Sequence, residues 1–504
     1  MNSRNIAMPT LRRLASDTIW YGLSNIISRF ANYLLTPIHT KIFLPQEYGI
    51  IGDLYVYVAF LNVIYTFGTE TSYFRYANDL GEQKIYNQNF TSLILYSTLL
   101  SGIIIFFASP IANLLDYPGK EKYIIYLGLL MAVDTLLSLP FARLRWLKKP
   151  RLFAFAKFFN IGLYILLNLF FLWFCKDVAE GKYLTFLQDF MLSWFNPKDL
   201  VGYVFLAQLL ANAPLFWLLR KEIWNYQPTW DKDLAKKVFF YSYPLVILGL
   251  AGTLNTTADR FFIKNYLPDS FGNQQHILGV YFACIKFSVF ILVLIQGYRY
   301  AAEPFFFSKA KDKNAPELLA KAMEYFVAVA CFSVILVSLN TDWLKYLLLR
   351  NRAYDEGLII VPTFLFANLF LGIYYNLTAW FKIADKTQYG TYISLIGAVI
   401  TIIGNLGWLP VLGILGSAVA SLVTYASMSF LCYYWGQKFY PVPYRIGIIL
   451  GYVALSAVLV WWGNSFSAES IWLNILLKNL LVVPFMGAVL IVEWQNLKTL
   501  KIFR

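Results

Sequence analysis

Runs of about 20 apolar residues recur from one end of the chain to the other, and no segment between them is long enough to build its own core. A run of this length crosses the roughly 30 Å of hydrocarbon in a bilayer as an α-helix. The composition agrees, because 59% of the 504 residues are hydrophobic and only 14% are charged. We therefore expect an all-α integral membrane protein.

The sequence contains fourteen such runs. They cover residues 17–38, 49–69, 91–109, 123–142, 153–174, 201–219, 238–257, 278–298, 322–340, 358–379, 389–409, 411–434, 446–463 and 471–492. At Gly413 a loop of very few residues must separate two helices. The polar segment 1–16 shows no cleavable pattern, so we expect a cytoplasmic N-terminal segment followed by an uncleaved anchor helix.

Lys and Arg are distributed unevenly over the loops. With a cytoplasmic N-terminus, 27 of the 42 lie on inner segments, 11 on outer loops and four inside spans. Positively charged loops stay in the cytoplasm, so both termini are expected there. The net charge of +14 does not indicate nucleic-acid binding, because the basic residues are dispersed over inner loops such as RLRWLKKPR (143–151).

The chain contains four cysteines and two histidines, without CxxC or another metal-ligating spacing. The sequence therefore supports neither a disulfide framework nor a zinc site, and we expect no metal and no cofactor.

One phrase occurs twice, as KIFLPQEYG (41–49) and KNYLPDSFG (264–272), with an offset of 223 residues. Pro stops a helix and Gly permits the tight turn into the next one. The offset covers six helices, and an even number preserves orientation. We therefore expect two parallel six-helix bundles, residues 17–220 and 221–435, followed by two additional helices and a cytoplasmic tail in 436–504.

Six segments together resemble bacterial polysaccharide flippases of the multidrug, oligosaccharidyl-lipid and polysaccharide exporter superfamily. These segments are TPIHTKIFLPQEYGI, TETSYFRYA, FARLRWLKKPRLFAFAKFFNI, LAGTLNTTADRFFIKNYLP, LGVYFACIKF and QGYRYAAEPFFFSKAKDK. The resemblance covers roughly residues 11–435, and the last two helices carry no such motif.

The resemblance implies a fourteen-helix transporter, not an enzyme, in the bacterial cytoplasmic (inner) membrane. Its cargo would be an undecaprenyl-diphosphate-linked oligosaccharide, moved from the inner to the outer leaflet for cell-surface polysaccharide such as lipopolysaccharide. Paired bundles of this kind alternate between inward-open and outward-open states. The implied partners are the lipid-linked oligosaccharide, membrane lipid and polysaccharide polymerase machinery, and we expect a monomer.

Three cations inside spans are candidates for binding the diphosphate. Arg29 and Lys286 lie near mid-bilayer, where a charge normally faces a cavity or a partner. Their alternative role is to pair with a buried acid and fix helix packing. Lys157 lies about one turn inside its helix, so it can also snorkel to the headgroups. Asn32 and Asn255 occupy equivalent repeat positions and are assigned to the same cavity.

Five other residues are candidates for gating or coupling. Asp134 and Asp259 are the acids available to the buried cations. Arg260 is adjacent to Asp259, and neighbours on a helix point in different directions, so a simple pair is not expected. The two residues either form part of an outer gate or are solvated at the surface. Arg299 and Glu303 have i, i+4 spacing and suit an inner gate, with Pro304 ending or bending their helix.

Two other functions remain open. A multidrug extruder of the same superfamily would bind organic cations through buried acids, for which Asp53, Glu70, Asp134 and Asp259 are available. A membrane glycosyltransferase or polymerase would need a positioned acid or base, and the longest outer loop, about 175–200, offers acids but no histidine.

Overall fold

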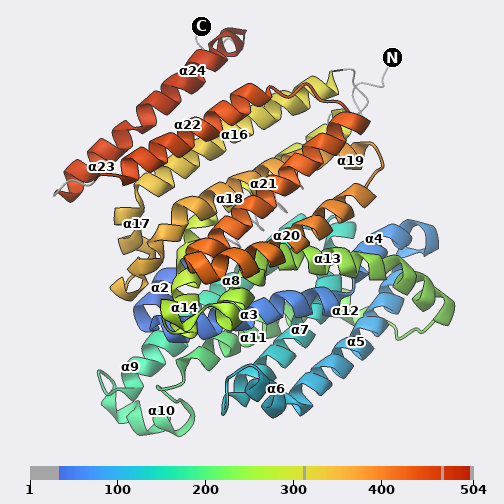
Figure 1. The fold of residues 1–504 in the computed structure, drawn as a ribbon. Coiled ribbons are helices and arrows are strands. Elements are labelled where there is room, and N and C mark those ends of the chain that lie inside the picture. The colour runs from blue at the N-terminus through green and yellow to red at the C-terminus, as the bar shows by residue number, and fades with distance from the viewer. Residues whose placement is uncertain (1–32, 310–313, 467–469, 500–504) are drawn as a thin grey trace. The chain divides into compact units, whose positions relative to one another are not determined.

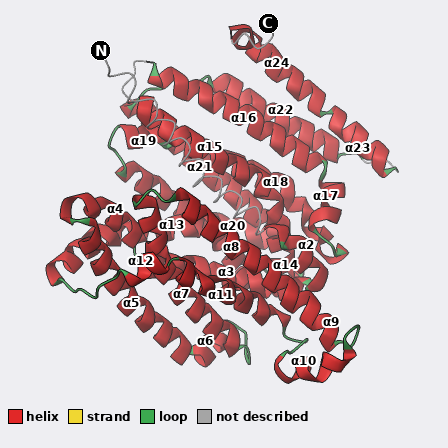
Figure 2. Ribbon diagram, turned by 180° about the vertical axis from the view of Figure 1, so that it is seen from behind, coloured by secondary structure: helices red, strands yellow, loops and turns green. Residues whose placement is uncertain are grey.

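A computed structural model describes residues 33–309, 314–466 and 470–499 of the chain (Figure 1). Every regular element in these ranges is a helix, and loops and turns join them without a strand (Figure 2). The prediction of an all-α fold is confirmed.

The described chain divides into two compact units. Unit 1 contains residues 33–35 and Asp53–Thr253, and unit 2 contains Thr36–Gly52 and the described residues from Leu254 onward. The division passes through two helices, since α3 begins in unit 2 and α13 begins in unit 1. The six-helix halves expected from the sequence repeat remain a prediction.

Unit 1 is built mainly from long apolar helices with short helical connections. Its elements are most of α3 (Pro45–Thr66), α4 (Thr69–Leu80), α5 (Glu82–Phe106), α6 (Ala108–Leu114), α7 (Glu121–Trp146), α8 (Pro150–Leu169), η1 (Phe170–Cys175), α9 (Lys176–Ala179), η2 (Thr185–Leu187), α10 (Gln188–Trp194), α11 (Leu200–Leu218), α12 (Arg220–Trp224) and the first part of α13 (Lys232–Tyr266).

Unit 2 also consists of long helices joined by short helical connections. Its elements are α2 (Thr36–Ile42), the start of α3, the rest of α13, η3 (Asp269–Phe271), α14 (Gln274–Cys284), η4 (Ile285–Ser288), α15 (Val289–Lys309), α16 (Ala315–Leu339), α17 (Thr341–Leu348), η5 (Arg352–Ile360), α18 (Val361–Leu377), α19 (Ala379–Ile383), α20 (Gln388–Leu412), α21 (Ile414–Phe439), α22 (Ile446–Asn464), α23 (Ile471–Leu480) and α24 (Val482–Thr499).

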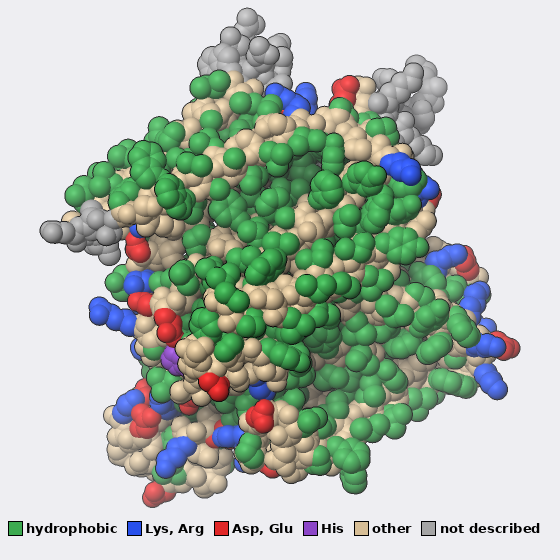
Figure 3. Space-filling view, viewed as in Figure 1, with side chains coloured by type: hydrophobic (Ala, Val, Ile, Leu, Met, Phe, Trp, Pro, Cys, Tyr) green, Lys and Arg blue, Asp and Glu red, His purple; other side chains and the backbone are tan. Residues whose placement is uncertain are grey.

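Thirteen helices in the described ranges are long and apolar enough to cross a bilayer. They correspond to thirteen of the fourteen predicted runs, and the remaining run, 17–38, lies mostly outside the described residues. Hydrophobic side chains cover most of the helical surface in view in Figure 3. The chain is a multi-pass membrane protein, and its apolar exterior is suited to contact with lipid.

The turn predicted at Gly413 is present and very short. α20 ends at Leu412 and α21 begins at Ile414, with Gly413 alone between them at φ 58° and ψ −142°. A side chain at Gly413 would have its Cβ 2.8 Å from the ring of Phe271. Backbone conformation and lack of space therefore both require glycine here.

We expect Gly413→Ala to destabilise unit 2 by about 1–3 kcal/mol, the usual cost of a strained backbone conformation. The measurement is the thermal unfolding midpoint of the purified protein in detergent. Gly407→Ala is the control, because Gly407 lies in α20 with no atom within 4 Å of the added methyl. Equal midpoints for both variants would contradict the prediction.

The two copies of the repeated phrase lie close together in unit 2. The first separates α2 from α3, and the second separates α13 from α14. A methyl group on Gly49 would lie 2.3 Å from the carbonyl oxygen of Gln275, and one on Gly279 would lie 1.7 Å from that of Pro45. α3 and α14 therefore touch through their backbones. The residues that follow the two phrases therefore lie side by side in unit 2.

Candidate functional site

Charged residues within the described spans occur mainly in small polar clusters, and two of these contain predicted site residues. The first lies in unit 1 and joins α7, α8 and α11. Asn212 donates a hydrogen bond from Nδ2 to Asp134 Oδ1, and Asn160 donates from Nδ2 to Asn212 Oδ1 at 2.6 Å. Lys157 interacts electrostatically with Asp134 and places its Nζ 4.3 Å from the centroid of the Phe141 ring. We call these residues the unit 1 cluster.

The unit 1 cluster changes the interpretation of Lys157. α8 begins at Pro150, so Lys157 lies about two turns, not one, from the helix start. Its neighbours are the Asp134 carboxylate and an aromatic ring. The acid offsets the cost of placing an ammonium group in the membrane. The cluster contains one cation and one anion and is electrically balanced.

A second set of polar contacts continues along α8 and α11. Tyr55 donates a hydrogen bond to Gln208 Oε1 at 2.7 Å, and its hydroxyl lies 3.3 Å from that of Tyr164. Tyr164 follows Asn160 by one turn of α8, and Gln208 precedes Asn212 by one turn of α11. The sequence interpretation missed this polar face, although the i, i+4 spacing of polar residues in both apolar runs was the available signal.

The second cluster lies in unit 2, where α13 meets α14. Tyr281 donates a hydrogen bond to Asp259 Oδ2 at 2.5 Å. Arg260 Nε lies 3.8 Å from Asp259 Oδ1, and the Arg260 guanidinium lies 5.4 Å from the centroid of the Phe282 ring. Lys286 Nζ lies 4.0 Å from the same centroid. We call these five residues the unit 2 cluster.

The unit 2 cluster brings two basic side chains, Arg260 and Lys286, together beside the carboxylate of Asp259. Asp259 and Arg260 are not simply each other's partner, because Arg260 Nε lies 3.8 Å from Asp259 Oδ1, beyond hydrogen-bond distance. Asp259 also has a partner in Tyr281. Basic side chains inside a membrane span are typical of sites that meet an anionic ligand or a buried acid.

Lys286 lies in a short 3₁₀ segment that interrupts the α-helical span. The α-helix of α14 ends at Cys284, and the 3₁₀-helix η4 leads into α15. Such a tightened turn inside a long helix often marks a functional hinge. No Pro or Gly lies in the IKFS segment, so this interruption of the helix was not predictable.

The remaining predicted site residues lie outside these two clusters or outside the described residues. Arg29 and Asn32 lie outside the described residues. Asn255 is 5% exposed and joins α13 to α20, donating to the carbonyl of Ser394 at 3.0 Å. Arg299 places its guanidinium 4.3 Å from the centroid of the Tyr375 ring.

The predicted inner-gate pair is only partly described. The side chain of Glu303 lies outside the description, so its pairing with Arg299 remains a prediction. α15 continues to Lys309, so Pro304 does not end it.

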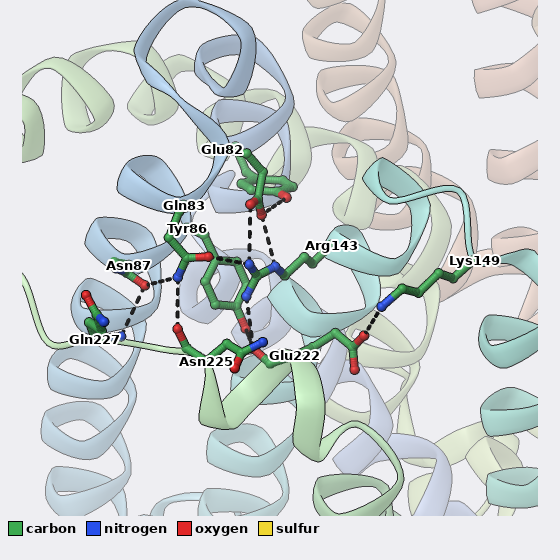
Figure 4. A network of polar contacts seen from close by, with 10 residues as sticks. Glu82, Gln83, Tyr86, Asn87, Arg143, Lys149, Glu222, Asn225 and Gln227 are labelled. Carbon is green, nitrogen blue, oxygen red and sulfur yellow. Dashed lines mark hydrogen bonds and ion pairs between the residues drawn. The ribbon is translucent and has the colours of Figure 1, made fainter.

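A network missed by the sequence interpretation joins α5, α7 and α12 in unit 1 (Figure 4). Arg143 is 6% exposed, its Nε lies 3.0 Å from Glu82 Oε1, and its guanidinium lies 4.2 Å from the centroid of the Tyr86 ring. Lys149 donates to Glu222 Oε1 at 2.7 Å. The RLRWLKKPR loop therefore contributes to packing as well as to topology. Partners 61 and 73 residues apart leave no local pattern in the sequence.

The order and packing of the helices are shared with solved membrane-protein structures. The structure described as lipid II flippase MurJ in an inward closed conformation superposes with a TM-score of 0.72 at 13% identity, covering 95% of this chain and 100% of that chain. An inward-facing multidrug resistance MATE family transporter of the MOP superfamily gives a TM-score of 0.60 at 12% identity, covering 87% and 98%. An outward-facing MATE structure gives 0.57 at 13% identity, covering 86% and 96%.

The sequence also matches a specific family model. The model described as "Polysaccharide biosynthesis protein" matches residues 38–175. No curated protein matches the sequence. Together the fold and this match support the predicted resemblance to a polysaccharide or oligosaccharide flippase of the MOP superfamily.

Proposed function

We propose that the protein flips an undecaprenyl-diphosphate-linked oligosaccharide from the inner to the outer leaflet of the bacterial cytoplasmic membrane. The fold of a membrane transporter and the polysaccharide-biosynthesis match support a flippase. Transport proceeds by alternating access and supplies cell-surface polysaccharide assembly, with polymerase machinery as the downstream partner. The protein acts as a monomer and as a transporter rather than an enzyme.

The observation that carries this proposal is the pair of basic side chains, Arg260 and Lys286, that lie at the same Phe282 ring in the unit 2 cluster. A lipid diphosphate brings negative charge into a region of low dielectric, and fixed cations offset the loss of hydration. Arg260 offers a planar fork suited to phosphate oxygens, and Lys286 acts as a point charge. Arg29, the other cation that the sequence assigns to diphosphate binding, lies outside the described residues.

Asp259 and Tyr281 have a positioning role in this mechanism. The carboxylate holds Arg260, and the Tyr281 hydroxyl holds the carboxylate. Because Asp259 competes with the cargo for Arg260, attraction stays moderate and the diphosphate is released when the site opens outward. Arg299 and Glu303 serve an inner gate, and Asp134 with Lys157 serves coupling in unit 1.

A multidrug exporter of the same superfamily is the second candidate. The similarity to MATE structures and a buried acid in α3 favour it. Asp53 is 0% exposed and accepts a hydrogen bond from Tyr117 at 2.8 Å, as a proton-coupling carboxylate could.

Transport in proteoliposomes distinguishes the two functions. Purified protein is reconstituted with a fluorescent lipid-linked oligosaccharide in one preparation and with a cationic dye in another. We expect loss of the lipid-linked sugar from the starting leaflet and no accumulation of dye. Dye transport without movement of the lipid-linked sugar would favour the multidrug exporter.

The orientation proposal places both termini and the loop after α7 in the cytoplasm. We expect Arg151→Cys to react with an impermeant thiol reagent only after the membrane is opened, and Lys198→Cys to react in intact spheroplasts. Both positions are exposed, whereas all four native cysteines are buried and give a low background. Labelling of Arg151→Cys in intact spheroplasts would reverse the topology.

A further inference from the structure

An exposed aromatic surface lies on the connection between two membrane spans of unit 1. η2 and α10 follow the span that ends with α9 and precede α11, and α9 and α10 lie together at one end of the unit (Figures 1 and 2). Phe186 is 78% exposed and Phe190 is 66% exposed, and Trp194 is exposed as well. These side chains recur at i, i+4 and i+8 along the helical segment 185–194. We call these three residues the aromatic stripe.

The opposite side of this helical segment already packs against unit 1. Met191 and Phe195 are buried. The Phe195 ring stacks on that of Tyr203 in α11 at a centroid distance of 4.5 Å, and Gln188 Nε2 donates a hydrogen bond to the carbonyl of Ala179 at 3.0 Å. These contacts hold α10 in place. The aromatic stripe is therefore a second apolar face, which the packing of unit 1 leaves outside.

Ring contacts connect the aromatic stripe to the lipid-facing side of the preceding span. Leu166 and Phe170 are exposed and lie one turn apart where α8 leads into η1. The ring centroids of Phe170 and Phe171 are 5.3 Å apart, and those of Phe171 and Trp194 are 6.5 Å apart. Exposed apolar side chains on a spanning helix meet hydrocarbon. The lipid-facing surface of the span therefore continues onto α10.

The charges of this connection do not favour an ionic partner. Residues 176–199 contain three lysines and four acids, so they carry no excess positive charge for an anionic headgroup or a phosphate. Lys182 Nζ already pairs with Asp177 at 2.7 Å and with Glu180 at 2.8 Å. The interaction that the connection offers is burial of aromatic side chains.

We propose that the aromatic stripe inserts into the interfacial region of the bilayer, so that α10 lies in the membrane plane beside the end of its span. Aromatic rings are enriched at this depth, and interfacial helices bury their apolar face about 5–10 Å into the boundary between headgroups and acyl chains. The leaflet is the outer one if the orientation proposed above holds. The contact anchors the connection to α11 and does not depend on the cargo.

Spin-label accessibility of the purified full-length protein in nanodiscs tests this contact without any cargo. A nitroxide is attached to Phe186→Cys or, independently, to Phe190→Cys. Its relaxation is measured with oxygen, which concentrates in the bilayer, and with a water-soluble nickel chelate. All four native cysteines are buried and give a low background. We expect the ratio of oxygen to nickel accessibility to be severalfold higher at both positions than at the control Lys182→Cys, since Lys182 is an exposed, charged position of the same connection.

Leu166→Cys is the lipid-facing reference, and both stripe positions should give a ratio close to it. The ratio should be the same in zwitterionic and anionic nanodiscs, because the connection carries no excess positive charge. Strong nickel accessibility at both stripe positions would overturn the proposal. Exclusion of both reagents would overturn it as well, since a partner protein or a second copy of the chain would then cover the stripe in place of lipid.

Discussion

Replacing Lys286 by Met should slow the flipping of lipid-linked oligosaccharide on the order of tenfold to a hundredfold. Met keeps most of the side-chain volume and removes the charge, so the variant should still fold and insert. Hydrogen bonds to charged groups contribute about 1.5–3 kcal/mol, and each 1.36 kcal/mol corresponds to a factor of ten. Arg260→Gln should have a similar effect, because both cations face the same ring in the unit 2 cluster.

The measurement is the initial flipping rate in proteoliposomes at equal protein content. Lys286→Arg should retain more activity than Lys286→Met, since it keeps a cation near Phe282. Lys438→Met is the matched control, because Lys438 is an exposed lysine at the end of α21. A wild-type rate for a well-folded Lys286→Met protein would show that the unit 2 cluster serves helix packing only.

Gly279→Ala should prevent unit 2 from forming its native packing. The added Cβ would lie 1.7 Å from the carbonyl oxygen of Pro45 and 2.9 Å from the backbone nitrogen of Gly49. Both are backbone atoms, so no side-chain rotation relieves the overlap and α3 must move away from α14. We expect a loss of at least about 3 kcal/mol, the upper end of the usual cost of overpacking.

The yield of monodisperse protein in detergent and its unfolding midpoint measure this effect. Gly451→Ala is the control, because Gly451 lies in α22 and its added methyl meets no atom within 4 Å. The control should match the wild type or exceed it slightly, since Ala favours a helix over Gly. Normal yield and stability for Gly279→Ala would mean that α3 and α14 do not approach this closely.

Hydropathy predicted the helices well because the bilayer imposes one rule on every span. A helix that satisfies its own backbone hydrogen bonds needs about 20 apolar residues, so the apolar runs indicate the spans directly. The turn at Gly413 was predictable for a related reason, since a long apolar stretch must break where glycine permits a sharp turn. The interruption at η4 was not predictable, because its residues are compatible with a regular helix.

The polar clusters were harder to predict because they depend on which helices pack together. Intramembrane charge identified Asp134, Lys157 and Lys286 as candidates. The sequence did not show that Asn212 would bind Asp134, or that Arg260 would share a ring with Lys286.

The packing network around Arg143 was missed for the same reason. Its partners come from distant helices, and the basic loop had a sufficient explanation in topology.

Binding of a lipid-linked oligosaccharide with and without its diphosphate tests the central claim most directly. The purified protein is titrated with an undecaprenyl-diphosphate-linked oligosaccharide and, separately, with a neutral undecaprenol-linked analogue carrying the same sugar. We predict that the diphosphate ligand binds much more tightly, and that Lys286→Met and Arg260→Gln remove most of this difference. Equal binding of the neutral analogue, or preferential binding of a cationic dye, would contradict the account.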